Sequence, residues 1–314
     1  MNILFIQPSA GFLMRGTTYP VCRSIMVTAS YMKYIGYNVL VYDRCIDFRK
    51  ADDVINSFSP DFVMIYVPPS SSLQDAINIS VKCKERGAIV AWGEVVASAF
   101  AEKIVSNNYA DFIITGETEI KLSSLVREYF GNKNYFSIPG LTYMENNEVI
   151  VTENKIDCDL DTLPQIDWDL IDVKKCFRQF PHCQRMLYMY TSRGCPFKCT
   201  YCYNTMFYGS RHRKRSVKYV LNEIKYLEQN YKLDGANFSD ELLLLSDEEI
   251  DEILKASAYN LIKDYTRDDY VYYLNADGSD GWYRGTITAN QLAAFAAHRT
   301  VLGVHIVQLT GDAL

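Results

Sequence analysis

The chain has 314 residues and a formal net charge of −6, with 48% apolar and 22% charged residues. This composition is typical of globular proteins, and the acidic balance argues against a large nucleic-acid footprint. No apolar run approaches the roughly 20 residues that span a bilayer, and the first residues lack the basic segment of a secretion signal. Nine cysteines, an odd number, do not predict a disulfide framework. We therefore expect a cytoplasmic protein without a membrane partner.

The first 130 residues alternate short apolar runs with amphipathic segments. The pattern predicts strands over 2–7, 37–42, 61–67, 88–92 and 111–115, and helices over 24–35, 73–86, 97–106 and 120–129. Such alternation predicts α/β architecture with a doubly wound, Rossmann-like parallel sheet. Ligands of these sheets bind beyond the carboxyl ends of the strands. Neither G-x-G-x-x-G nor a P-loop follows the first strand, which disfavours a dinucleotide.

Residues 131–185 read as a connector between two domains. Two strands, over 136–143 and 148–152, flank Asn146-Asn147, which is a hairpin signal. The acidic, aperiodic stretch 157–172 then reads as a linker. We expect domains at 1–130 and 186–314 with this hairpin and linker between them.

A strand over 186–191 leads into a stretch with three cysteines at C-x3-C-x2-C spacing: Cys195, Cys199 and Cys202. Thiolates select iron–sulfur clusters or zinc. Three thiolates from one loop would leave one iron of a four-iron cluster without a protein ligand, which favours chemistry at that iron over simple electron transfer. The alternative is a structural zinc site with a fourth ligand from Cys176, His182 or Cys183.

Further βα units follow this stretch. The basic run 211–215 reads as a solvated face or as a contact for an anion, and Ser216 as the N-cap of a helix over 217–229. A strand over 235–238 ends at the acidic pair Asp240 and Glu241, and a third strand over 270–274 precedes Asn275. A helix over 289–298 and a strand over 301–309 would form a fourth unit.

Arg193-Gly194-Cys195-Pro196-Phe197, together with the aromatic Tyr201 before the third cysteine, resembles the cluster loop of the radical S-adenosylmethionine (SAM) enzymes. The resemblance implies a 4Fe-4S cluster held by the three cysteines, with SAM bound to the open iron and cleaved to a 5′-deoxyadenosyl radical. It places Tyr201 near the adenine. Asp240, Glu241 and Asn275 are the other candidate SAM-binding residues.

The N-terminal half, with Gly116-Glu117-Thr118-Glu119 after its last strand, resembles the cobalamin-binding domain that precedes many radical SAM domains. Gly93, Gly116 and Glu117 are the candidate cobalamin-binding residues. The family's D-x-H-x-x-G motif is absent and no histidine precedes His182. Any cobalamin would therefore lack a histidine ligand from this domain, or the domain has lost the cofactor. The glutamates also have a simpler explanation, as acids at a helix N-terminus.

The resemblance implies cobalamin-dependent C-methylation of a small molecule, with a reductant such as flavodoxin or ferredoxin as partner and no nucleic acid. The alternatives are radical cyclisation or rearrangement without methylcobalamin, and a truncated, non-catalytic cluster-binding protein. The C-terminal part reads as an incomplete (βα) partial barrel, with fewer units than the family's core. We expect either that the natural chain continues past Leu314 or that an oligomer covers the open edge.

Overall fold

A computed structural model describes residues 1–9, 23–68, 72–155, 158–180, 183–242, 249, 270–274 and 280–284. The chain divides into two compact units. One comprises Met1–Cys176 with Phe197–Ser210, and the other comprises Phe177–Pro196 with Arg211–Leu314. Each unit contains its own β-sheet.

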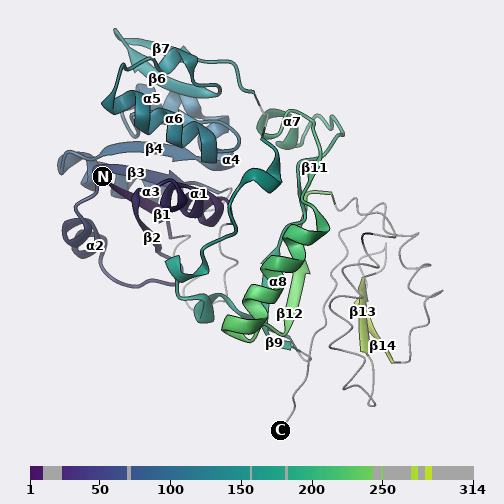
Figure 1. Cartoon of the computed structure of the whole chain (residues 1–314). Coiled ribbons are helices and arrows are strands. Elements are labelled where there is room, and N and C mark those ends of the chain that lie inside the picture. The colour runs from purple at the N-terminus through teal and green to yellow at the C-terminus, as the bar shows by residue number, and fades with distance from the viewer. Residues whose placement is uncertain are drawn as a thin grey trace. The chain divides into compact units, whose positions relative to one another are not determined.

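The first unit is built on a seven-stranded sheet with the order β2-β1-β3-β4-β5-β6-β7 (Figure 1). The strands are β1 (Asn2–Gln7), β2 (Asn38–Asp43), β3 (Phe62–Tyr66), β4 (Ile89–Gly93), β5 (Phe112–Ile114), β6 (Leu141–Glu145) and β7 (Glu148–Val151). The first five are parallel to one another. Their buried apolar sequences are those expected of a parallel sheet covered on both faces.

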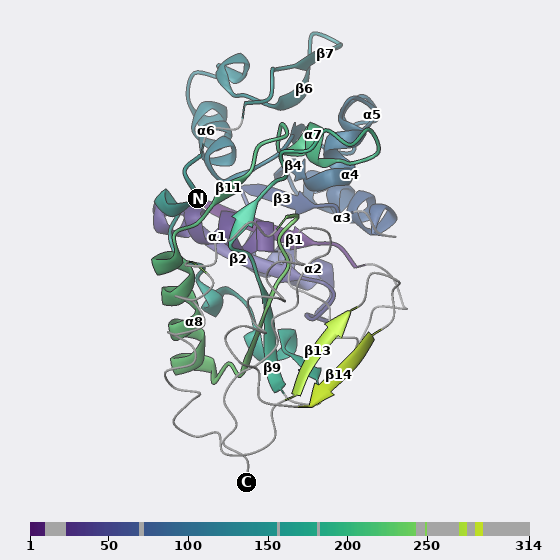
Figure 2. The same ribbon diagram turned by 90° about the vertical axis from the view of Figure 1, so that its right-hand side faces the viewer.

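Helices cover both faces of this sheet, as Figure 2 shows. One face packs against α2 (Ala51–Phe58), α3 (Leu73–Glu85), α4 (Glu94–Ala99) and α5 (Ala101–Ser106), in a core that includes Leu4, Val63 and Trp92. The other face carries α1 (Arg23–Tyr34) and α6 (Glu119–Phe130), which contact each other. The predicted doubly wound arrangement is confirmed for this unit.

The hairpin expected in the connector belongs to the sheet instead. Its strand β6 pairs antiparallel with β5, and β7 pairs with β6. This pairing covers the edge that β5 would otherwise leave open. The helix expected over 97–106 is also interrupted, since α4 ends at Ala99 and α5 begins at Ala101.

One helix of this unit was not predicted. α2 carries Asp52 and Asp53 in its first turn and ends at Ser59 in a left-handed conformation. One short 3-10 turn precedes the hairpin formed by β6 and β7, and three follow it. These turns are Tyr135–Ser137, Leu160–Thr162, Trp168–Leu170 and Val173–Cys176. The helix α7 (Asn204–Phe207) comes directly after the cysteine stretch and belongs to the first unit.

The second unit contains a three-stranded sheet with the order β12-β9-β8. β9 (Cys183–Met189) and β12 (Gly235–Phe238) are parallel and are joined through α8 (Val217–Tyr231), which forms the predicted βα unit. The Ser216 hydroxyl accepts a hydrogen bond from the Tyr219 amide at 3.2 Å, so the predicted N-cap is confirmed. β8 (Arg178–Phe180) pairs antiparallel with β9, and the short β10 (Ser192–Arg193) pairs with β11 (Arg213–Lys214).

The third strand expected over 270–274 is confirmed, but its pairing differs from the expected series. β13 (Tyr270–Leu274) pairs antiparallel with β14 (Asp280–Arg284), so these strands form a hairpin rather than the next step of a parallel series. Asp277-Gly278, which lies between the two aromatic-rich runs, is a hairpin signal that explains this pairing. The helix expected over 289–298 and the strand over 301–309 lie outside the described residues. Across the part of the chain that is described, no helix is both long and apolar enough to cross a membrane.

Candidate functional site

Asp240, at the end of β12, supports the backbone where the cysteine stretch begins. Its Oδ1 accepts hydrogen bonds from the Thr191 amide at 2.8 Å, from the Ser192 amide, and from both hydroxyls of these residues. Burial raises the pKa of Asp240, although the hydrogen bonds oppose this effect. Its Oδ2 is buried and has no hydrogen-bond partner among the described residues. This oxygen is therefore an acceptor that a cationic ligand would satisfy.

Glu241 supports the next part of the same backbone. Its Oε2 accepts a hydrogen bond from the Gly194 amide at 3.1 Å, and burial raises the pKa of its carboxyl group. Gly194 has a φ of 80°, a left-handed conformation in which glycine is favoured. The structure therefore brings both predicted acids to the backbone just before Cys195, where their carboxylates accept hydrogen bonds from main-chain amides.

The three cysteines differ in exposure. Cys199 is exposed, whereas Cys195 and Cys202 are half-buried. The Cys202 amide donates to the Cys199 carbonyl at 3.1 Å and closes a turn between these two residues. Within the described residues, no three His, Cys, Asp or Glu side chains gather into a metal-binding group. Three accessible thiols at this spacing nevertheless form a donor set that fits an iron–sulfur cluster.

Tyr201, the candidate adenine neighbour, is 91% exposed. The negative charge of a Cys199 thiolate raises the pKa of Tyr201. The Tyr201 ring therefore lies open beside the thiols, with its surface available for stacking. Asn275, the last candidate SAM-binding residue, lies outside the described residues.

The zinc alternative depends on a fourth ligand from just upstream. Cys176 is buried, its Sγ donates to the Asp172 carbonyl at 3.6 Å, and burial raises the pKa of its thiol. These are the properties of a packed thiol rather than of an offered ligand. His182 and the side chain of Cys183 lie outside the described residues.

The candidate glycines of the first unit lie in close internal contact. A Cβ at Gly93 would be 2.6 Å from Met64 Cε and 3.1 Å from Thr118 Cγ2. Gly116 has a φ of +79°, and a Cβ there would be 2.8 Å from the Phe207 carbonyl oxygen. Packing within the unit therefore explains why both positions are glycine.

A buried cluster of hydroxyls lies next to Glu117, at the carboxyl ends of the parallel strands. The sequence did not predict it. Thr118 Oγ1 is 2.7 Å from both Thr28 Oγ1 and the Tyr66 hydroxyl. Thr28 and Thr118 are almost fully buried, as is Tyr66. The cluster ties α1 and the end of β3 to the start of α6, and it fixes the segment that carries Gly116 and Glu117.

Lys121 and Asn154 form a second pair that the sequence reasoning missed. Lys121 Nζ donates to the Thr115 carbonyl and to Asn154 Oδ1, each at 2.6 Å. Burial lowers the pKa of Lys121 to about 8, although the charges of Glu117 and Glu119 oppose this effect. The pair links α6 to the strand end of β5 and to the chain after β7.

Two buried polar groups mark the carboxyl ends of β1 and β2, where a doubly wound sheet binds its ligands. Gln7 Oε1 is buried and has no hydrogen-bond partner among the described residues. Burial raises the pKa of Asp43 to about 6, although hydrogen bonds from Cys45 oppose this effect. An orphaned acceptor in this place fits a bound ligand with polar hydrogen atoms.

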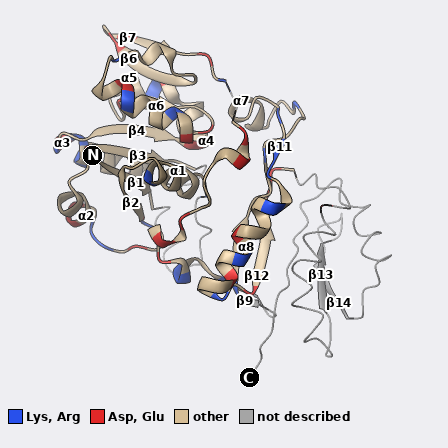
Figure 3. Ribbon diagram, in the orientation of Figure 1, with Lys and Arg blue, Asp and Glu red and all other residues tan. Residues whose placement is uncertain are grey.

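Figure 3 shows basic residues in blue around β11, in the run after α7. This run is only partly the expected solvated face, because Arg211 and Lys214 are exposed whereas Arg215 is buried. Arg215 is only 4% exposed, and its guanidinium carbon lies 4.0 Å from the centre of the Tyr219 ring. His212 Nε2 lies 2.9 Å from the Leu242 carbonyl oxygen. Lys214 donates to Glu249 at 2.8 Å. These side chains support the second unit.

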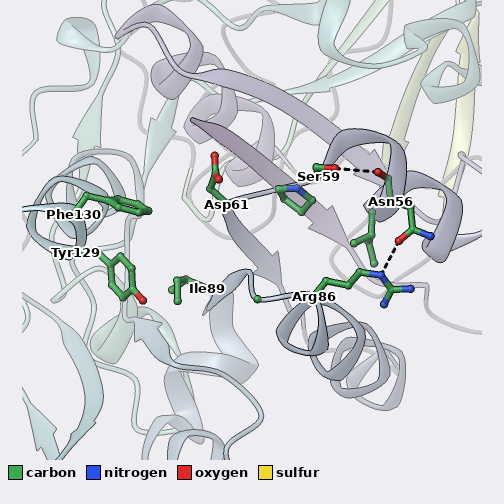
Figure 4. A pocket seen from close by; sticks show the side chains of 10 residues that line it. Asn56, Ser59, Asp61, Arg86, Ile89, Tyr129 and Phe130 are labelled. Carbon is green, nitrogen blue, oxygen red and sulfur yellow. Dashed lines mark hydrogen bonds between the residues drawn. The ribbon is translucent and has the colours of Figure 1, made fainter.

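A shallow cleft of about 530 Å³ lies at the amino ends of β3 and β4 (Figure 4), the edge opposite to the ligand edge. Its arginine, Arg86, donates to Asn56 Oδ1 at 2.7 Å and to Asp52 Oδ1 at 2.8 Å. The Ser59 hydroxyl donates to the Asn56 carbonyl at 3.1 Å. Since these polar groups pair with one another, the cleft does not compete with the cysteine stretch as the functional site.

The chain resembles curated methyltransferases and cyclases in sequence. It is 26% identical over 256 residues to an uncharacterized methyltransferase of Pyrococcus horikoshii, covering 78% of this chain and 54% of that protein. It is 22% identical over 294 residues to the cytidylyl-2-hydroxyethylphosphonate methyltransferase of Streptomyces wedmorensis, covering 76% of this chain and 54% of that protein. It is 24% identical over 262 residues to the anaerobic magnesium-protoporphyrin IX monomethyl ester cyclase of Cereibacter sphaeroides, covering 79% and 41%. The chain thus spans about half the length of these relatives, or less.

No protein-family model matches the chain. Two solved structures share its fold at low sequence identity. The radical SAM methyltransferase TsrM of Kitasatospora setae, with cobalamin and a [4Fe-4S] cluster bound, superimposes with a TM-score of 0.66 at 15% identity, over 84% of this chain and 53% of that one. The cobalamin-dependent radical SAM enzyme OxsB with aqua-cobalamin superimposes with a TM-score of 0.67 at 16% identity. The match covers 85% of this chain and 37% of the OxsB chain. The chain thus shares the fold of two cobalamin-binding radical SAM enzymes and resembles the named methyltransferases and cyclase in sequence.

Proposed function

We propose that this chain carries the cofactor-binding core of a radical SAM enzyme that methylates a carbon atom of a small molecule. The observation that carries the proposal is the stretch with Cys195, Cys199 and Cys202, which begins on backbone held by two half-buried acids, Asp240 and Glu241. Two of the relatives described above are methyltransferases by name, which supports methylation.

In this proposal the three cysteines hold a 4Fe-4S cluster, and the protein provides the position and the surroundings of the bound groups. Once bound and reduced by an external electron donor such as flavodoxin or ferredoxin, the cluster would supply the electron that cleaves SAM to methionine and a 5′-deoxyadenosyl radical. Asp240 offers its buried Oδ2 to the ammonium group of SAM, while its Oδ1 keeps the backbone in place. The exposed ring of Tyr201 stacks on the adenine. Glu241 orients the Gly194 peptide before Cys195.

Cobalamin is the second proposed cofactor. TsrM and OxsB bind cobalamin, and the first unit shares their fold. In this chain the cofactor would lie at the carboxyl edge of the sheet. Gln7 Oε1 has no hydrogen-bond partner there among the described residues, and Gly93, Gly116 and Glu117 follow strands that end at this edge. Because no histidine precedes His182, no imidazole of this domain holds the cobalt. Titration with aqua-cobalamin should change its visible spectrum and give saturable binding.

Radical cyclisation without methylcobalamin is the competing function, and the likeness to the cyclase of Cereibacter sphaeroides favours it. The same titration separates the two. Saturable cobalamin binding supports methyl transfer, and the absence of binding by a protein with an intact cluster supports cyclisation or rearrangement.

Anaerobic reconstitution with iron and sulfide tests the cluster. The parent should bind about four iron ions and show a thiolate-to-iron charge-transfer band. Cys199→Ala should lose both. Cys158→Ala is a matched control, because Cys158 is a half-buried cysteine outside the motif. If a variant without all three motif cysteines binds as much iron as the parent, the proposal is wrong.

A further inference from the structure

The helix α7 begins two residues after Cys202 and packs on the first unit. Phe207, at its end, is 3% exposed and the following Tyr208 is 8% exposed. Together with Val95 of α4 they form a small apolar cluster, in which the two rings pack edge to face with centroids 4.8 Å apart. α7 is thus anchored by burial, although it spans only one helical turn.

The backbone of α7 also touches the end of β5. The Phe207 carbonyl oxygen lies where it would be 2.8 Å from a Cβ at Gly116, so only glycine admits this approach. The carbonyl of the neighbouring Met206 accepts a hydrogen bond from Asn154 Nδ2 at 3.4 Å. Both contacts come from segments of the cobalamin-binding-type fold.

Lys121 determines which way the Asn154 amide faces. A lysine ammonium can only donate, so the atom of Asn154 that it contacts must be Oδ1. With Oδ1 held by Lys121 Nζ at 2.6 Å, the amide nitrogen faces the Met206 carbonyl. Lys121 is itself held, because Nζ also donates to the Thr115 carbonyl. A chain of contacts therefore runs from the end of β5 through Lys121 and Asn154 to α7.

We propose that Gly116, Lys121 and Asn154 form a seat for α7, and that this seat positions Cys199 and Cys202 for the cluster. The cysteine turn is closed by the bond from the Cys202 amide to the Cys199 carbonyl, and only Tyr203 separates Cys202 from α7. With one intervening residue the chain has little slack, so a displacement of α7 moves the turn. These three are positioning residues, and the cluster part of the inference rests on the proposed function.

Hydrogen exchange in the metal-free protein tests the seat without any cofactor. The reporters are the amides of Phe207 and Tyr208, which donate to the Tyr203 and Asn204 carbonyls at 2.9 and 2.8 Å. Asn154→Asp keeps an acceptor for Lys121 but cannot donate to Met206. Exchange of the two amides should rise about fivefold, the factor that corresponds to one hydrogen bond of about 1 kcal/mol.

Gly116→Ala should have the same effect or a larger one, because its Cβ pushes on the Phe207 carbonyl. Gly87→Ala is the matched control: its φ of +81° is nearly that of Gly116, but nothing lies within 4 Å of the added carbon. It carries the same backbone strain without the contact, so α7 should exchange as in the parent. Circular dichroism checks that every variant keeps its fold.

The second measurement uses the reconstituted protein. Asn154→Asp and Gly116→Ala should release iron to a ferrous chelator about fivefold faster than Gly87→Ala, and the midpoint potential of the cluster should shift. If α7 exchanges as in the control in both variants, or if iron release and potential are unchanged while exchange rises, the seat does not position the ligands and the inference fails. A parent that takes up no cysteine-dependent iron would instead refute the proposed function.

Discussion

Asp43 gives the protein a pH-dependent stability whose direction follows from the structure. The residue ends β2, is 3% exposed, and accepts a hydrogen bond from the Cys45 amide at 2.9 Å. Burial raises the pKa of its carboxyl group from 3.8 to about 6. In the folded protein Asp43 therefore holds its proton more tightly than in the unfolded chain.

The sign follows from proton linkage. Between pH 3.8 and about 6 the folded state binds more protons than the unfolded state, so the free energy of unfolding falls as the pH rises through this interval. A difference of about two pKa units corresponds to about 3 kcal/mol. This contribution is fully present below pH 3.8 and is lost above about pH 6. At neutral pH, Asp43 is a buried charge that opposes folding.

Asp43→Asn removes the charge and keeps an oxygen for the Cys45 amide. We expect the variant to be more stable than the parent by up to about 3 kcal/mol at pH 7.5, with the difference disappearing near pH 4. Urea unfolding of the metal-free proteins at several pH values measures this. Asp53→Asn, at an exposed position in α2, is the control and should change stability by only a few tenths of a kcal/mol at either pH. A constant difference between Asp43→Asn and the parent from pH 4 to 7.5 would refute the reasoning.

Three further predictions concern buried polar groups. Thr118→Val should lower the free energy of unfolding by about 1–3 kcal/mol in urea titrations, because it removes the buried hydroxyl that bonds to those of Thr28 and Tyr66. An unchanged midpoint would contradict this. Lys121→Met should abolish the component of stability that rises between pH 8 and 10.5, since the unfolded chain holds that lysine's proton more tightly in this interval. An identical alkaline dependence in parent and variant would rule this out. Asp240→Ala should weaken SAM binding at least tenfold, as measured by equilibrium dialysis. It removes both the Oδ2 acceptor offered to SAM and the hydrogen bond that supports the Thr191 backbone. SAM bound as tightly as by the parent would argue against that role.

The strands of the first unit could be predicted because each is a continuous apolar run bounded by turn residues, as with 2–7 and 61–67. The parallel order follows from the intervening helices. α2 escaped prediction because its apolar face is short, with Val54 and Ile55 as its main buried positions. The position of the hairpin in the sheet could not be predicted, since strand pairing is decided by tertiary contacts.

In the candidate site, too, the features that are local in sequence could be predicted and the long-range contacts could not. The three cysteines are local in sequence, so their spacing predicted a three-thiolate metal site, and the residues around them supplied the resemblance to a cluster loop. The acids Asp240 and Glu241 were predicted as SAM-binding residues, but their contacts with the backbone of Ser192 and Gly194 bridge nearly fifty residues and could not be foreseen. In the first unit, the hydrogen-bonded pairs Thr28–Thr118, Tyr66–Thr118 and Lys121–Asn154 join residues that are 33 to 90 positions apart in the sequence. Such contacts leave no local pattern in a sequence.

The electron paramagnetic resonance spectrum of the reduced, reconstituted protein tests the central claim most directly. Three cysteine ligands leave one iron open, so adding SAM should change the spectrum of the parent and of Cys158→Ala. Cys199→Ala should show no cluster signal. A cluster whose spectrum is indifferent to saturating SAM, or one that persists when Cys199 is replaced, would contradict the account.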